Sequence, residues 1–301
     1  MNAEVSAPKL FMTGTLYLLP TVISGETLAS VIPAEVRDKA RRIDHFLVEA
    51  AKTARHYLKD LGHPKPIASL SIVEIGHEPD PAKIDAWLAP LREGFDMAIV
   101  SESGCPGVAD PGAQIVARVQ AEGGRVVPLV GPSSLLLTLM ASGLDGQHFR
   151  FTGYLPIADA ERRGALLALE RESARSETIL FIETPYRNRT MLESLLEVLR
   201  PDTRLCVAQD VTGKNESIRT KTIAAWKAAS EEERELLKIP TVFAFLAAPQ
   251  RMPAKEKSAL RPSAATPHGE RMGEDSRPRK GGHGRGRSPR SGAHRKGKTG
   301  R

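Results

Sequence analysis

Three glutamates stand where predicted strands end, and their carboxylates could take a proton from a reacting group. Glu49, Glu102 and Glu183 each follow a short apolar run. Open α/β sheets bind their ligands at the carboxyl ends of strands, and a carboxylate positioned there can act as a general base. Arg187, four residues beyond Glu183, could hold a phosphate with two hydrogen bonds. These four residues are the candidate catalytic residues of the chain.

One predicted strand end carries an unusually long loop. Residues 97–100 read as a buried strand, and the loop 101–112 that follows contains three glycines and two prolines. A plain connection between a strand and a helix needs only about 2 to 6 residues, and glycine lets a backbone approach a ligand closely. A helix over 113–121 and a strand over 125–129 complete a right-handed crossover. The loop therefore predicts a binding site for a small ligand.

These loops must be positioned by α/β domains. Five predicted strands with intervening helices reach residue 130, which indicates a mostly parallel sheet. The pattern repeats less regularly afterwards and predicts a second sheet with antiparallel members. We place an N-terminal α/β domain at 9–130 and a C-terminal α/β domain at 131–250. Helices are expected over 81–91 and 135–141, the second capped by a preceding serine.

The net charge of +7 hides two oppositely charged parts. Residues 251–301 hold 15 Lys and Arg against 4 Asp and Glu, whereas the preceding 250 residues hold 28 against 32. The last segment, with a charge of +11, is rich in Gly, Pro, Ser and Arg, and this composition predicts a disordered tail. It is typical of arginine-glycine segments that bind RNA, and a tail that only increases solubility is the alternative.

Composition also sets aside several classes of protein. No apolar run approaches the roughly 18 residues of a membrane helix, and no secretory signal begins the chain, so a cytoplasmic protein without a membrane contact is expected. The two cysteines, Cys105 and Cys206, form no disulfide framework, and the scattered histidines predict no metal site. The Gly-x-Gly-x-x-Gly loop of dinucleotide-binding proteins is missing after the first strand.

Four ordered motifs carry a family resemblance. Residues 100–112, 128–134, 142–144 and 181–187 resemble the tetrapyrrole methylase superfamily of S-adenosylmethionine-dependent methyltransferases, and within it the ribosomal RNA small subunit methyltransferase I branch, which methylates a cytidine 2′-hydroxyl. The likeness spans about 14–247. It implies a class III methyltransferase fold, in which the cofactor lies in a cleft between two α/β domains, and it implies a homodimer acting on RNA.

The resemblance also implies which residues hold S-adenosylmethionine, largely through backbone groups. They come from the long loop, the turn after residue 131, the end of the strand before residue 183, and the start of the last strand: Ser101, Ser103, Gly104, Pro106, Val108, Ala109, Asp110, Pro132, Ser133, Ser134, Ile182, Thr184 and Thr241.

Two departures from that branch keep other functions open. Residues 21–26 replace its Thr-Pro-Ile-Gly-Asn type loop, and Glu49-Ala50 replaces its Glu-Asp pair. The alternatives are a tetrapyrrole C-methyltransferase acting on a corrin or siroheme precursor, and an RNA-associated module that binds S-adenosylmethionine without turnover. The tail and the missing Gly-rich first loop favour RNA over a tetrapyrrole.

Overall fold

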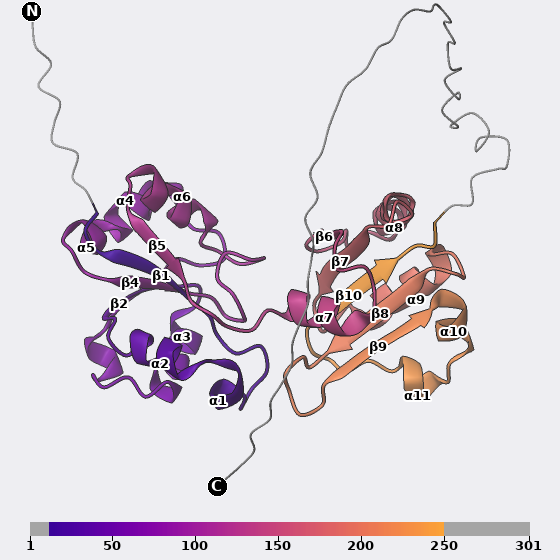
Figure 1. The fold of residues 1–301 in the computed structure, drawn as a ribbon, viewed down its shortest axis with the longest axis horizontal. Helices are drawn as coiled ribbons and strands as arrows, with labels where there is room; N and C mark the ends of the chain where they lie inside the picture. The colour runs from indigo at the N-terminus through magenta and orange to yellow at the C-terminus, as the bar shows by residue number, and fades with distance from the viewer. Residues whose placement is uncertain (1–11, 250–301) are drawn as a thin grey trace, which may run out of the picture. The chain divides into compact units, whose positions relative to one another are not determined.

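The computed structural model describes residues 12–249, which form two five-stranded sheets with helices packed on them (Figure 1). The predicted tail and residues 9–11 lie outside this range. The first half consists of β1 (Thr15–Leu19), α1 (Leu28–Val31), α2 (Ala34–Ala40), β2 (His45–Val48), α3 (Ala51–Asp60), η1 (Ile67–Ser69), β3 (Ser71–Glu74), η2 (Pro81–Lys83), α4 (Ile84–Trp87), α5 (Ala89–Arg92), β4 (Met97–Val100), α6 (Ala113–Ala121) and β5 (Arg125–Pro128).

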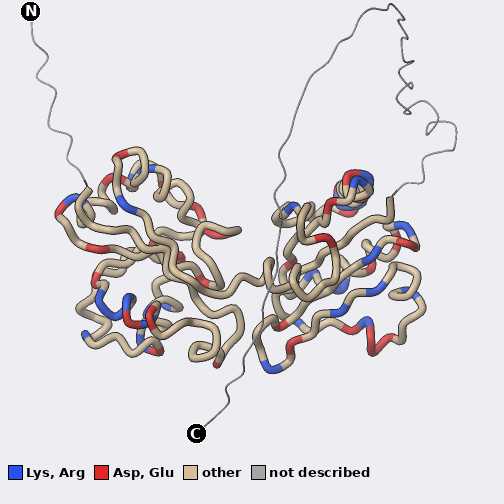
Figure 2. Tube along the Cα trace, in the orientation of Figure 1, with Lys and Arg blue, Asp and Glu red and all other residues tan. Residues whose placement is uncertain are grey.

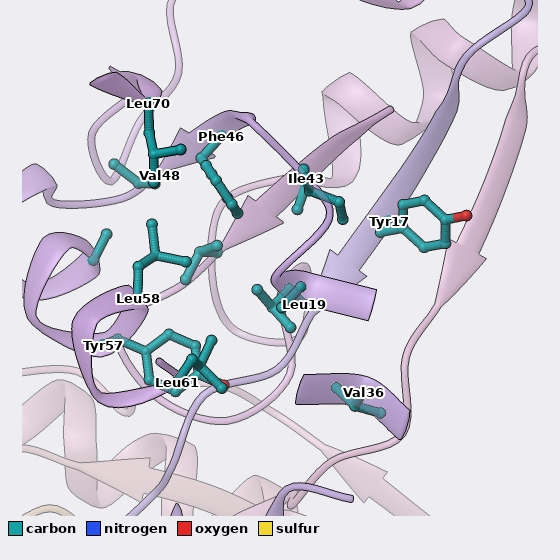
Figure 3. Packing of buried hydrophobic residues seen from close by; sticks show 14 of the residues in the cluster. Tyr17, Leu19, Val36, Ile43, Phe46, Val48, Tyr57, Leu58, Leu61 and Leu70 are labelled. Atoms are coloured by element: carbon teal, nitrogen blue, oxygen red, sulfur yellow. The ribbon is translucent and has the colours of Figure 1, made fainter. Parts of the chain in front are cut away.

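The first sheet is parallel throughout, with strand order β3-β2-β4-β1-β5. Alternate side chains of one strand point to opposite faces, so each central strand serves two cores. Phe46 and Val48 of β2 pack with α2 and α3, whereas Leu47 packs with the helices of the other face. Figure 3 shows the first of these cores, in which Tyr57 and Leu58 of α3 lie against the sheet.

The second half consists of α7 (Ser134–Ser142), β6 (Phe149–Phe151), α8 (Asp159–Ser173), β7 (Thr178–Glu183), α9 (Asn188–Val198), β8 (Arg204–Gln209), β9 (Ser217–Thr222), α10 (Ile223–Ala228), α11 (Glu231–Arg234) and β10 (Thr241–Leu246). Its sheet has the order β6-β7-β10-β8-β9, and only the β6–β7 pair is parallel. The predicted antiparallel members are therefore confirmed. Helices α8, α9 and α10 cover one face around Phe181, Phe243 and Trp226, and α7 covers the other.

Two local predictions were wrong. The expected helix over 81–91 is divided into η2, α4 and α5, and the break between α4 and α5 arises because Pro90 cannot donate a backbone hydrogen bond and its ring crowds the preceding turn. The serine that precedes α7, Ser133, makes no side-chain bond to the first turn. This helix is instead held by packing against β9 and β10.

Charged side chains are interspersed over both halves (Figure 2). Within residues 12–249, no helix is both long enough and apolar enough to cross a bilayer.

Candidate active site

The carboxyl edge of the parallel sheet gathers several loops around Glu49. Its side chain is only 11% exposed. The Oε2 atom accepts a hydrogen bond from the backbone N–H of Glu102 at 3.0 Å, so the ends of β2 and β4 are joined through one carboxylate. Thr21, after β1, donates its N–H to the Gly104 carbonyl at 2.9 Å. Three strand ends that are far apart in sequence thus meet at one place, as parallel strands require.

His77 supplies the other contact of Glu49. It lies in the loop that follows β3, and its Nδ1 is 3.1 Å from Glu49 Oε1. The imidazole is 68% exposed, whereas its carboxylate partner is nearly covered. The hydrogen bond that His77 donates to Glu49 raises the pKa of His77 above its ordinary value of 6.5, and the charges of Glu49, Asp110 and Glu78 act in the same direction. The buried carboxylate therefore fixes one nitrogen of an accessible imidazole.

Glu102 points a second carboxylate toward the same edge. Its Oε1 accepts a hydrogen bond from the hydroxyl of Thr53 at 3.1 Å, and Thr53 also donates to the Ala50 carbonyl at the start of α3. Unlike Glu49, Glu102 is exposed. The two predicted catalytic glutamates of this sheet are brought together, but only one of them is held rigidly.

Asp110 closes the loop 101–112 with a half-buried carboxyl group. Burial raises its pKa to about 6, and the neighbouring charge of Glu49 contributes to the same shift. The preceding Ala109 has a φ of 63°, a left-handed conformation that a residue with a Cβ rarely adopts. The loop thus holds Asp110 through a strained backbone, and strain of this kind is concentrated at functional sites.

The same loop contacts the turn that follows β5. Cys105 Sγ lies 3.3 Å from the Pro132 carbonyl oxygen, and a Cβ added at Gly104 (φ 73°) would stand 3.3 Å from that oxygen. Ser101 is buried beside Asp110, and its hydroxyl partly offsets the rise in the pKa of that carboxyl. The structure therefore brings together two of the segments predicted to hold a cofactor.

The remaining predicted cofactor residues differ in exposure. Within the loop, Ser103, Val108 and Ala109 are exposed, whereas Gly104 and Pro106 are buried. In the second half, Ile182 and Thr184 flank Glu183 and are half-buried, Thr241 is buried opposite Glu183 in the β7–β10 register, and Ser133 and Ser134 are half-buried at the start of α7.

A cavity of about 720 Å³ opens beside Glu102. One side of α3 forms its wall and carries Lys52, Arg55 and Lys59, whose spacing puts them on one face of the helix. These three cations form no ion pair with any residue that the structure describes. The floor includes Thr21, whose buried hydroxyl has no partner within the described part of the chain.

Glu183 has quite different surroundings at the end of β7. Its side chain is fully buried, and Oε2 lies 2.9 Å from Arg187 Nη2. Oε1 accepts the backbone N–H of Thr184 at 2.7 Å. Arg187 also donates to the carbonyls of Leu155 and Pro156, at 3.1 and 3.3 Å. The two candidate catalytic residues of this sheet are paired with each other.

Two amides that the sequence did not single out hold the segment before β10. Asn188 donates to the carbonyls of Leu237 and Ile239 at 3.1 and 2.7 Å. Gln209 exchanges two hydrogen bonds with the backbone of Leu237 and donates to Thr241 Oγ1 at 2.8 Å. This clamp fixes the position of Thr241.

His77 was also missed by the sequence analysis. A single histidine after a short, half-exposed strand has no spacing signal, and only its place at a strand end could have indicated it. Within residues 12–249, no three histidine, cysteine, aspartate or glutamate side chains are grouped so as to hold a metal ion.

The family is decided by comparison with known proteins. The family model described as Tetrapyrrole (Corrin/Porphyrin) Methylases matches residues 29–226. The chain belongs to the tetrapyrrole methylase family. It is therefore a methyltransferase that uses S-adenosylmethionine as its methyl donor, and the sequence-based predictions of fold class, enzyme class and cofactor are confirmed.

Individual members of the family resemble the chain over most of its length. The ribosomal RNA small subunit methyltransferase I of Bacillus subtilis is 33% identical over 211 residues, which are 70% of this chain and 68% of that protein. The protein of the same name from Escherichia coli O157:H7 is 31% identical over 226 residues, covering 74% and 75%. Among solved structures, the methyltransferase CobJ is 20% identical, with a TM-score of 0.49 and coverage of 80% and 96%.

Proposed function

We propose that this tetrapyrrole methylase family member transfers a methyl group from S-adenosylmethionine to a ribose 2′-hydroxyl of RNA, with ribosomal RNA as the first substrate to test. The names of its relatives support a ribosomal RNA substrate. The observation that carries the proposal is the carboxyl edge of the parallel sheet, where Glu49 holds the backbone of Glu102 and Glu102 lines a cavity together with unpaired cations. That edge combines groups that accept a proton with groups that attract a phosphate.

Residues of the loop 101–112 fit the methyl donor. S-adenosylmethionine supplies a methyl group on a positively charged sulfur, and it also carries an ammonium group. The half-buried carboxyl of Asp110 offers a negative charge to these positive groups, and the Ser101 hydroxyl beside it offers a hydrogen bond. We propose that the loop and the Pro132–Ser134 turn hold the donor, together with Ile182, Thr184 and Thr241.

Alignment of donor and acceptor provides most of the expected rate enhancement. Methyl transfer is an in-line displacement, and positioning of this kind can contribute roughly 7 to 11 kcal/mol. A 2′-hydroxyl is a weak acid, so a base at the sheet edge adds about 10² to 10⁴ in rate. The protein therefore orients the acceptor hydroxyl and supplies the base that takes its proton.

The α3 face suits a single-stranded RNA backbone. Lys52, Arg55 and Lys59 point three unpaired cations along the cavity wall, within a body whose net charge is otherwise negative. Phosphate contacts from such side chains raise affinity for RNA without reading its sequence. We propose that this wall binds the phosphates next to the methylated ribose.

The function is tested by offering the full chain methyl-labelled S-adenosylmethionine with small ribosomal subunits, naked ribosomal RNA or a reduced tetrapyrrole. Label in RNA that is lost when the target nucleotide is replaced by its 2′-deoxy form supports the proposal. Label in the tetrapyrrole would instead establish the C-methyltransferase alternative. If the protein binds S-adenosylmethionine but labels none of these acceptors, the alternative of a binding module without turnover would be supported.

The α3 wall is tested separately through the salt dependence of RNA binding. Replacing Lys52, Arg55 and Lys59 with glutamine should flatten the log-log slope by about 0.7 for each lost phosphate contact. Arg42→Gln is the matched control, because Arg42 is exposed, forms no ion pair with the described residues and precedes β2 at the opposite edge of the sheet. If the slope of RNA affinity against salt is the same for the triple variant and the control, α3 does not contact the RNA phosphates.

The remaining predictions follow from this function. The basic tail would raise the local concentration of RNA, and the protein would work in the cytoplasm as a homodimer. Deleting 255–301 tests the tail by the same salt-slope measurement.

A further inference from the structure

We propose that His77 is the general base of the reaction and that Glu49 is its positioning residue: the imidazole Nε2 accepts the proton of the RNA 2′-hydroxyl as the methyl group is transferred. This inference rests on the proposed function. It places the base on a histidine, whereas the sequence had indicated the glutamates as candidate bases.

Geometry favours the imidazole over the carboxylate as the group that meets the acceptor. Glu49 is 11% exposed, and both of its oxygens are engaged, one by the Glu102 N–H and one by His77. His77 is 68% exposed, and its Nε2 makes no hydrogen bond to the described residues. An incoming hydroxyl therefore reaches His77 first.

The hydrogen bond also selects the useful form of the imidazole. A carboxylate accepts, so Nδ1 must be the nitrogen that carries the proton. In the neutral ring this leaves Nε2 with a free electron pair directed outward. Glu49 then stabilises the imidazolium once Nε2 has taken a proton, which is the part that the carboxylate plays in other histidine–carboxylate pairs.

The charges around His77 make it a stronger base. The hydrogen bond to Glu49 raises its pKa most, desolvation opposes part of this rise, and the charges of Glu49, Asp110 and Glu78 add to it. Asp110 and His77 both line a second cavity, of about 550 Å³, formed by the loop 101–112 and the segment after β3. The proposed donor-binding loop and the proposed base thus line the same cavity.

The proposed step conserves atoms and charge. The 2′-oxygen forms a bond to the methyl carbon while the bond from that carbon to sulfur breaks, and the sulfur keeps the electron pair. The hydroxyl proton moves to His77 Nε2. The positive charge that leaves the sulfonium therefore appears on the imidazolium, which later releases its proton to water.

The pairing is tested without catalysis by titrating the His77 ring in the full chain by NMR. The wild-type pKa should lie above 6.5, and Glu49→Gln should lower it toward that value. His148, which lies 3.6 Å from Asp145 in the second half, marks a site that Glu49→Gln does not touch. A His77 pKa that is unchanged in Glu49→Gln would contradict the pairing.

Kinetics test the role as a base. His77→Gln should lower kcat by about 10² to 10⁴, with S-adenosylmethionine affinity within about twofold of wild type. The wild-type rate should fall as pH drops through the His77 pKa, since only the neutral ring accepts a proton. In His77→Gln this inflection should vanish, and the residual rate should climb steadily with pH.

Controls separate this inference from the proposed function. His148→Gln should keep the wild-type rate. An active wild type with an equally active His77→Gln would overturn the inference and leave RNA methylation intact, as would a His77→Gln variant that changes only KM. A wild type that methylates no RNA would overturn both.

Discussion

Glu49 and Glu183 are the same residue type at the ends of two buried strands, and each accepts a backbone N–H, yet they differ in their basic partner and in their access to solvent. The Glu49 carboxylate accepts a hydrogen bond from the Glu102 N–H and contacts the exposed His77, and each of these two partners lines a cavity. Glu183 is sealed from solvent and faces Arg187, which in turn holds the carbonyls of Leu155 and Pro156. The strand end thus fixes where the carboxylate lies, and the neighbouring loops determine whether it can exchange protons with a substrate.

The comparison predicts a loss of turnover at one site and a loss of stability at the other. Removing one partner of a buried ion pair destabilises the fold, because the remaining charge is left without a counter-charge. A carboxylate that orients an exposed imidazole can be neutralised with little effect on the fold.

The largest effect should come from Glu49→Gln. Loss of the carboxylate removes both the orientation of His77 and the charge that stabilises its imidazolium, so kcat should fall by about 10² to 10³. The midpoint of urea unfolding should move little. If Glu49→Gln keeps the wild-type turnover, the carboxylate at the end of β2 has no role in catalysis and the contrast with Glu183 fails.

Glu183→Gln should act mainly on stability. It leaves Arg187 without its partner at the end of β7, at a cost of about 3 kcal/mol in the free energy of unfolding. Urea unfolding measures this loss, and Glu193→Gln is the control, because Glu193 forms an exposed ion pair with Arg189 on α9. If the destabilisation is no greater than that of the control, Glu183 is not held as the structure indicates.

The smallest effect concerns Asp110 and depends on pH. Folding raises the pKa of Asp110 to about 6, so the charged carboxylate destabilises the folded state. This cost is complete above pH 6, where the group is charged in both states. It is absent below pH 3.8, where the group is neutral in both states. Asp110→Asn should therefore stabilise the protein at pH 7.5 by about 1 kcal/mol, since solvent screens part of the penalty. Thermal unfolding at pH 7.5 and pH 4 tests this, and the gain should disappear at the lower pH.

The sequence predicted the first sheet well because its inner strands β1, β2 and β4 are largely buried and appear as short apolar runs. The strand 97–100 and the helix 113–121 were predicted with their observed bounds. The helix over 81–91 failed because the interruption by Pro90 depends on the preceding turn rather than on hydrophobic spacing. Periodicity identifies faces and lengths, but not breaks within a helix.

The candidate site was predicted only as far as the strand ends allow. Glu49 and Glu102 could be placed together because parallel strands end at one edge of a sheet. The partner of Glu49 could not, because His77 is 28 residues away and its orientation depends on a loop. The ion pair of Glu183 was likewise hidden, although Arg187 had been noted four residues away.

Tyr57 gives the α3 wall an optical signal of its own. Its hydroxyl donates to the Pro20 carbonyl at 2.5 Å, and burial raises the pKa of the phenol far above its ordinary value. The ring lies behind the cavity, between α3 and the end of β1. In an alkaline absorbance titration its tyrosinate band should therefore arise only when this part of the fold opens, so a late ultraviolet step would report the opening of the wall without any label.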